Sequence, residues 1–215
     1  MSAALWLEKV REWDVAGFYL INGSFRNRIF DFLMPFITDM WKFVLPLSLL
    51  FLYVLIFRPK RDRILVISAL AVFLLTDGMT PFVKSLFQRI RPCHVLQQIY
   101  VAKGVICTGS FSLPSTHASN MFAIASVFSY NSKWLAILYF AIAALVGYSR
   151  IYVGAHYPTD VLAGVVWGML VGFPAAIAIN RLTRIGQHND LRPKVEGKDR
   201  PVSHTRPSQP HKPPG

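Results

Sequence analysis

Two histidines and one carboxylate in the C-terminal half of the chain have the types and spacing that phosphoryl transfer needs. His156 and Asp160 are four residues apart, and Pro158 between them suits the first position of a helix. Asp160 would then lie in the first helical turn, where its carboxylate can hold one nitrogen of His156 and leave the other as a nucleophile or base. His117 lies on a separate segment and is free to protonate a leaving oxygen. No carboxylate set for a metal accompanies these histidines, so we expect neither a metal ion nor another cofactor.

Cationic and hydroxyl side chains near other predicted helix ends suit a phosphate group. The guanidinium groups of Arg91 and Arg150 can each bind two phosphate oxygens, and Lys84 adds a further positive charge. Ser115 and Thr116 open a predicted helix, whose free amide groups form a ready site for an anion. The sequence therefore predicts a phosphate-binding site assembled from separate segments.

The composition places these residues in a membrane protein. Of the 215 residues, 53% are hydrophobic and only 16% are charged, although Lys and Arg outnumber Asp and Glu by 23 to 11. A soluble domain carries about 25% charged residues, and here the charges lie between long apolar runs. We therefore expect the bilayer as a partner and no nucleic acid. The sequence gives no oligomeric state.

Apolar segments predict an all-α bundle of about five transmembrane helices. A span needs about 20 residues to cross about 30 Å of hydrocarbon, and its backbone groups must bond within the helix because lipid offers no partner. For the third and fourth segments a buried hairpin of short helices is the alternative. The segments are residues 43–57, 64–83, 118–132, 134–149 and 161–180.

The two ends of the chain differ from these segments. Residues 4–22 alternate apolar and charged residues at helical spacing, which favours either an amphipathic helix in the membrane interface, sometimes counted as a sixth helix, or a cap packed on the bundle. Residues 186–215 are rich in Pro, Lys, Arg and His and predict a disordered basic tail. We therefore expect a membrane-embedded domain over residues 1–185, followed by this tail.

Basic loops predict the orientation of the bundle. Residues 58–63 and the C-terminal tail are rich in Lys and Arg, and short basic loops stay on the cytoplasmic side. With five spans, residues 84–117 and 150–160 then lie on the opposite, periplasmic side of a bacterial cytoplasmic membrane. All the residues assigned to phosphate chemistry would meet there.

Three blocks of sequence resemble the motifs of the type 2 phosphatidic acid phosphatase (PAP2) superfamily, in its branch of bacterial membrane lipid phosphatases. The blocks are KSLFQRIRP (84–92), PSTH (114–117) and SRIYVGAHYPTD (149–160), and they occur in the order of the family. The resemblance covers residues 15–180, and the three blocks together are specific. Thr116 departs from the pattern, because the family has Gly there.

The resemblance implies a metal-independent membrane phosphatase that acts through a phosphohistidine. His156 would be the nucleophile, Asp160 its orienting partner and His117 the general acid and base. The residues that would bind the phosphoryl group are Lys84, Arg91, Ser115 and Arg150.

The resemblance implies a lipid phosphate as the substrate. We expect undecaprenyl diphosphate, because the chain is compact and lacks a large insert for a bulky headgroup. The alternatives are phosphatidylglycerophosphate, phosphatidic acid or lipid A phosphates, or transfer of the phosphoryl group to a lipid acceptor. A transporter is the competing class, but only Asp77 lies deep in a predicted span, whereas transporters place polar groups at the bilayer midplane. We expect a structural role for Asp77.

Two further patterns leave alternatives open. Cys93 and Cys107 lie in the predicted outer loop, either as a disulfide that closes a loop of about 15 residues or as two free thiols. Gly164, Gly168 and Gly172 recur every four residues, which lets another helix approach closely. That helix belongs either to this bundle or to a second copy of the chain.

Overall fold

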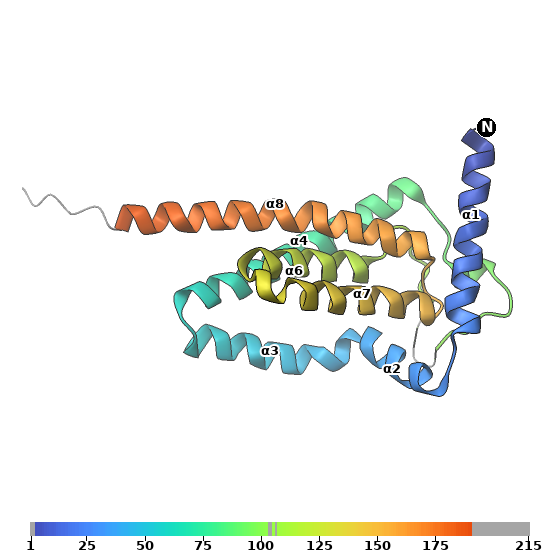
Figure 1. Ribbon diagram of the computed structural model, residues 1–215, viewed down its shortest axis with the longest axis horizontal. Coiled ribbons are helices and arrows are strands. Elements are labelled where there is room, and N and C mark those ends of the chain that lie inside the picture. The colour runs from blue at the N-terminus through green and yellow to red at the C-terminus, as the bar shows by residue number, and fades with distance from the viewer. Residues whose placement is uncertain (1–2, 103–104, 106, 191–215) are drawn as a thin grey trace, which may run out of the picture.

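The apolar segments form an all-α bundle in the computed structural model, which describes residues 3–102, 105 and 107–190 (Figure 1). The longer helices run side by side, and the N-terminal helix crosses one end of them. In chain order the elements are α1 (Ala3–Tyr19), the π-helical turn η1 (Leu20–Ser24), α2 (Arg28–Thr38), α3 (Met40–Phe57), α4 (Lys60–Phe87), α5 (Pro92–Val95), α6 (Thr116–Asn131), the 3-10 turn η2 (Lys133–Leu135), α7 (Ala136–Tyr152) and α8 (Pro158–Asp190).

Within the described residues, four helical segments are long and apolar enough to cross a membrane. They correspond to the first, second, fourth and fifth predicted segments: Met40–Phe57, Lys60–Val95, Lys133–Tyr152 and Pro158–Leu182. The third predicted segment is α6, which is also a helix but has only 16 residues. It is the central helix, packed against α4, α7 and α8.

Burial explains why α6 differs from its neighbours. Most of its side chains are buried, and many are small, whereas none of the side chains of α3 is buried. The hydroxyls of Ser119 and Ser126 donate to carbonyls one turn earlier on α6, at 2.9 and 2.8 Å, so their burial leaves no unpaired donor. A helix surrounded by protein does not need the apolar length that lipid demands.

The glycine stripe of α8 faces α6. A Cβ on Gly164 would lie 2.7 Å from the carbonyl oxygen of Ser115, and one on Gly172 would lie 2.6 Å from that of Ala123. Real side chains do not approach a carbonyl so closely, so glycine is required at this contact. Packing within the bundle is thus confirmed, and it brings the beginnings of α6 and α8 together.

The N-terminal helix α1 packs on the bundle, which is the second of the two expectations for this segment. Near its end, Phe18 is fully buried and its ring packs 5.8 Å from that of Tyr157. Nearer its start, Trp6, Leu7 and Trp13 are exposed. The helix therefore caps the bundle through one end, and its place in the membrane interface stays a prediction.

Two parts of the fold differ from the predicted boundaries. The helix α2, over residues 28–38, was not predicted; it ends before Asp39, whose carboxylate then caps α3 by accepting from the amide of Trp41 at 3.2 Å. The helix α8 runs to Asp190, past the predicted domain boundary at residue 185. The rest of the predicted tail, 191–215, lies outside the described residues.

Candidate active site

A cavity of about 160 Å³ gathers residues that are far apart in the sequence. It lies between α4, the beginning of α6, the end of α7 and the loop that precedes α8. Of the predicted site residues, the cavity lining contains both histidines, both arginines and Thr116. The complete lining is Met40, Asp77, Arg91, Thr108, Thr116, His117, Asn120, Arg150 and His156.

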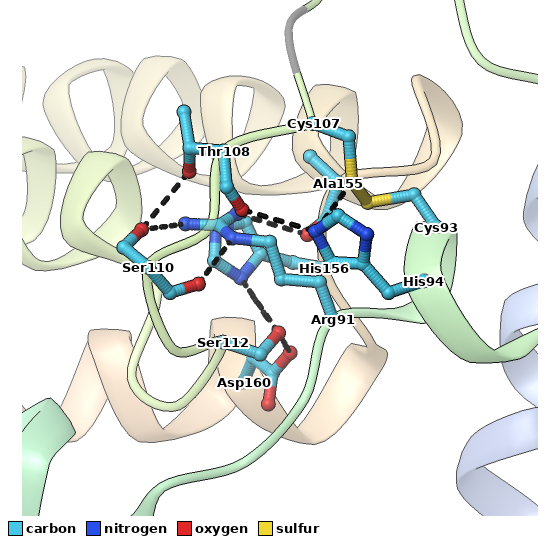
Figure 2. The surroundings of a disulfide bond; sticks show 10 residues. All are labelled: Arg91, Cys93, His94, Cys107, Thr108, Ser110, Ser112, Ala155, His156 and Asp160. Atoms are coloured by element: carbon cyan, nitrogen blue, oxygen red, sulfur yellow. Dashed lines mark hydrogen bonds and ion pairs between the residues drawn. A yellow bond between two sulfur atoms is a disulfide. The ribbon is translucent and has the colours of Figure 1, made fainter.

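Arg91 lies directly beside His156 (Figure 2). Its Nη1 atom is 3.0 Å from Nε2 of His156 and donates to the carbonyl of Ala155 at 3.1 Å. Its Nε and Nη2 atoms donate to the carbonyl and hydroxyl of Ser110, each at 2.9 Å. The guanidinium is thus held where a phosphoryl group would meet Nε2 of His156.

The other nitrogen of His156 faces Asp160 and Ser112. Nδ1 lies 3.5 Å from a carboxylate oxygen of Asp160 and 3.3 Å from the hydroxyl of Ser112, which itself donates to the same carboxylate oxygen through a very short hydrogen bond. Since the Ser112 hydroxyl gives its proton to Asp160, it can accept from Nδ1–H. This arrangement keeps the proton on Nδ1 and leaves a lone pair on Nε2, as a nucleophile requires.

Burial keeps His156 neutral. The residue lies in the loop between α7 and α8 and is 2% exposed. Removal from water lowers the pKa of His156 to about 3; the hydrogen bond to Asp160 opposes this shift, and the positive charges of Arg91 and Arg150 add to it. The imidazole therefore has a free lone pair at neutral pH.

Asp160 is fixed from behind by a network that reaches the N-terminal helix. Arg89 donates to the second carboxylate oxygen of Asp160 at 2.8 Å and also forms a very short ion pair with Asp14 of α1. The other oxygen of Asp14 accepts from the amide of Thr159 at 2.8 Å, which caps the beginning of α8. The ring of Tyr157 lies under the Arg89 guanidinium at 4.1 Å. The sequence predicted Asp160 in the site but not the roles of Arg89, Asp14 and Thr159 behind it.

Lys84 and Ser115 lie beside the cavity and hold neighbouring segments. The ammonium of Lys84 donates to the carbonyl of Phe111 at 2.7 Å, which leaves two of its protons for a ligand. The amide of Ser115, the N-cap residue of α6, donates to the carbonyl of Asp160 at 2.9 Å, so this one amide of the predicted anion site is already paired. The buried hydroxyl of Ser115 has no partner among the described residues.

Arg150 is almost completely buried at the end of α7. One terminal nitrogen donates to the hydroxyl of Thr38 through a very short hydrogen bond. Its Nε atom is buried without a partner in the part of the chain that the structure describes. A buried guanidinium with an unpaired donor on a cavity wall fits an anion, because leaving that donor unpaired is costly.

The segment that supplies Thr108, Ser110 and Ser112 is tied down by a disulfide. Cys93 and Cys107 are bonded, with their Cα atoms 6.4 Å apart, so the structure contains the first of the two predicted alternatives (Figure 2). Arg91 precedes one cysteine by two residues, and Thr108 follows the other directly. The disulfide therefore joins the segment that contains Arg91 to the segment that contains Thr108, and these two segments meet at His156.

Sequence reasoning gave no role to Ser112, Ser110, Asp14, Asn120 or Arg89, although Arg89 lies within the KSLFQRIRP block. Their common feature is that each acts through a partner from another element. Asp14, for instance, lies 75 residues from Arg89 and 145 from Thr159. No spacing rule links such distant positions, but two residues carried a local signal: Ser112 is three residues before Ser115, and Asn120 is three residues after His117 on one helix.

A bundle of membrane-spanning helices with this site at one end defines a class of membrane phosphatase. The model of the PAP2 superfamily matches residues 63–184, and the chain belongs to that superfamily. It is an integral membrane enzyme that acts on lipid phosphates.

Individual relatives have different substrates in their names. The chain is 28% identical over 177 residues to a lipid A 4′-phosphatase of Porphyromonas gingivalis, covering 77% of this chain and 72% of that protein. It is 33% identical over 115 residues to an undecaprenyl-diphosphatase of Sulfolobus acidocaldarius, covering 53% and 55%. The crystal structure of a phosphatidylglycerolphosphate phosphatase from Bacillus subtilis has the same fold, with a TM-score of 0.61, 23% identity, and coverage of 86% of this chain and 89% of that one.

Proposed function

We propose that this enzyme hydrolyses a phosphate monoester of an acylated sugar lipid of the lipid A type, through a phosphohistidine on His156. The observation that carries the proposal is the single cavity that His117, Arg91, Arg150 and His156 share at one end of the membrane bundle. The arrangement supplies a nucleophile, a proton donor and positive charge for the phosphoryl oxygens, which are the parts that displacement at phosphorus requires.

The proposed reaction has two displacements. Nε2 of His156 attacks phosphorus and the bond to the lipid oxygen breaks. His117, which holds an extra proton while the anionic phosphate is bound beside it, gives that proton to the lipid oxygen. Water, deprotonated by His117, then attacks the phosphohistidine and releases inorganic phosphate with His156 restored. Asp160 and Ser112 hold Nδ1–H throughout.

The phosphoryl oxygens are bound by residues around His156 in this proposal. Arg91, Arg150 and Thr116 bind them most directly, because all three line the cavity. Lys84 and the Ser115 hydroxyl, beside the cavity, complete the group. These residues bind the developing charge without a metal ion.

Two substrates compete as candidates. The sequence alone favoured undecaprenyl diphosphate, and an undecaprenyl-diphosphatase is among the relatives, although it aligns with only 53% of this chain. The match to a lipid A 4′-phosphatase extends over 77% of the chain. We therefore place the sugar lipid first and the prenyl diphosphate second.

We also propose the orientation and domain plan that the basic loops favour. The active site faces the periplasm, and the loop of residues 58–63 faces the cytoplasm with the C-terminal tail. In support, Arg61 donates to the carbonyl of Asn131 at 3.4 Å, so this basic loop lies at the end of α6 opposite His117. The catalytic domain extends through the end of α8 at Asp190, beyond the predicted boundary at residue 185, and the basic tail follows it.

A phosphate-release panel with the purified full chain in detergent tests the function. We expect release of one phosphate per lipid A-type 4′-phosphate consumed, unchanged activity in excess chelator and inhibition by vanadate. A strict metal requirement contradicts the histidine route. Loss of substrate phosphate without free phosphate indicates transfer to a lipid acceptor, and release from undecaprenyl diphosphate alone selects the second candidate.

A further inference from the structure

One wall of the cavity carries groups that the phosphoryl chemistry does not use. Asp77 of α4 and Asn120 of α6 both line the cavity, and the amide nitrogen of Asn120 donates to a carboxylate oxygen of Asp77 at 2.8 Å. Asn120 is only 3% exposed, and its Oδ1 atom has no partner among the described residues. A buried acceptor without a donor on a cavity wall requires an explanation.

The chemistry of the pair determines what it can bind. A carboxylate only accepts hydrogen bonds, so Asn120 must turn its NH₂ group toward Asp77 and its Oδ1 atom away. The pair therefore offers mainly acceptors, namely Oδ1 of Asn120 and the remaining lone pairs of Asp77, together with the second N–H of Asn120. Such a surface repels phosphate oxygens and attracts hydroxyl or amide N–H groups.

The position of the pair assigns it to the leaving group rather than to the phosphoryl group. Asn120 is three residues after His117 on α6, so the two side chains lie on the same face of the helix. Asp77 lies seven residues before Lys84 on α4, two helical turns farther from the phosphate-binding end. The oxygen that His117 protonates belongs to the leaving group, and Asn120, on the same face of α6, lines the same cavity.

We propose that Asp77 and Asn120 form the subsite for the leaving group and select one that carries hydroxyl or amide donors, as a sugar or polyol does. The inference rests on the proposed phosphatase function and narrows its substrate class. A diphosphate leaves as a phosphate, whose negative oxygens would face the Asp77 carboxylate. The subsite therefore disfavours prenyl diphosphates and favours phosphate monoesters of a donor-bearing headgroup.

The test compares two substrates on the full-length chain in detergent: a lipid A-type disaccharide 4′-phosphate and farnesyl diphosphate. In Asp77→Asn we expect kcat/KM for the sugar phosphate to fall about 10-fold, mainly through KM, because a charged acceptor is lost. The same variant should hydrolyse farnesyl diphosphate faster than the unaltered enzyme. Asn120→Ala should lower kcat/KM for the sugar phosphate without raising kcat/KM for farnesyl diphosphate. Ser68→Ala, which lies earlier on α4 and outside the cavity lining, is the matched control.

Equal changes for both substrates in Asp77→Asn overturn the subsite while leaving the phosphatase function intact. Absence of phosphate release from every lipid phosphate by the unaltered chain overturns the function itself. A second measurement does not depend on the folding of a variant: the dephosphorylated disaccharide lipid should inhibit the unaltered enzyme at least about 10-fold more strongly than farnesol. Equal inhibition by the two contradicts the proposal.

Discussion

Two groups of residues at the site differ in how completely their polar atoms are paired. In the paired group, Asp160 accepts hydrogen bonds from Ser112 and Arg89, and Arg89 is held in turn by Asp14. In the unpaired group, Nε of Arg150 and the hydroxyl of Ser115 are buried without partners among the described residues.

This difference indicates that the paired group is preorganised before a substrate binds, whereas the unpaired group is completed by the substrate. A paired network holds the nucleophile in one tautomer and one orientation, which removes reorganisation from the reaction. Unpaired buried donors are costly, and an anion that bonds to them recovers that cost as binding energy. We therefore expect substitutions in the paired group and in the unpaired group to affect different steps of the reaction.

The largest effect should follow from removal of the nucleophile. His156→Ala should lower kcat by about 10⁴- to 10⁶-fold, the range seen when a covalent nucleophile is removed. Rapid-quench experiments with ³²P-labelled lipid should detect an acid-labile phosphoprotein in the unaltered chain and none in the variant. Wild-type turnover by well-folded His156→Ala would remove His156 from the mechanism.

Substitution of Arg150 tests the unpaired group, which we expect to bind the anion. Arg150→Ala should lower kcat/KM by about 10²- to 10³-fold, as expected for loss of a charged group at the transferring phosphoryl. Vanadate inhibition should weaken as well, whereas His156 should keep its network. Arg150→Lys retains the charge but not the fork of donors, so it should restore only part of the activity. Unchanged vanadate affinity in the alanine variant contradicts the assignment.

Substitution of Asp14 tests the paired group at a residue that lies outside the cavity lining. Asp14→Asn removes one of the two carboxylates that hold Arg89, and it should lower kcat by roughly 2- to 30-fold, equivalent to about 0.5–2 kcal/mol of coupling within one network. KM and vanadate affinity should stay nearly constant, because Asp14 does not line the cavity. Glu12→Gln, an exposed substitution on the same helix, is the control. A change in KM alone would place Asp14 with substrate binding instead.

The smallest effect concerns pH. Because burial holds the pKa of His156 at about 3, its Nε2 lone pair stays available through mildly acidic pH. With p-nitrophenyl phosphate, whose leaving group needs no proton, protonation of His156 should change kcat/KM by less than about 2-fold between pH 7 and pH 5. An acid limb with its midpoint near 6.5 would show that the imidazole is exposed to water.

The same shift affects stability with a definite sign. The pKa of His156 is lower in the folded chain than in the unfolded one, so the unfolded chain binds the extra proton first as pH falls. The contribution of this residue to stability is complete above about pH 6.5 and is lost progressively toward pH 3. Thermal unfolding in detergent at several pH values measures the loss.

Much of the fold followed from local pattern. Long apolar runs forced the helices α3, α4, α7 and α8, because a backbone in lipid must bond to itself. The helix boundaries followed less closely from the pattern. The helix α8 extends past residue 185, and α2 was not predicted because its 11 residues are too few for a span. The glycine stripe predicted a close helix contact, but only the structure identified α6 as the partner rather than a second chain.

The sequence alone determined which residues could do the chemistry, since His117, Arg91, Arg150 and His156 stand in ordered motifs whose types and spacing suit phosphate. The tertiary structure decided how those residues are held and what lies opposite them. Asp14, Ser112 and Asn120 have their roles only through partners on other elements, and hydrogen bonds across a bundle leave no periodic trace in a sequence. Covalent neighbours fix local spacing, whereas the pairing of distant side chains depends on how the helices pack.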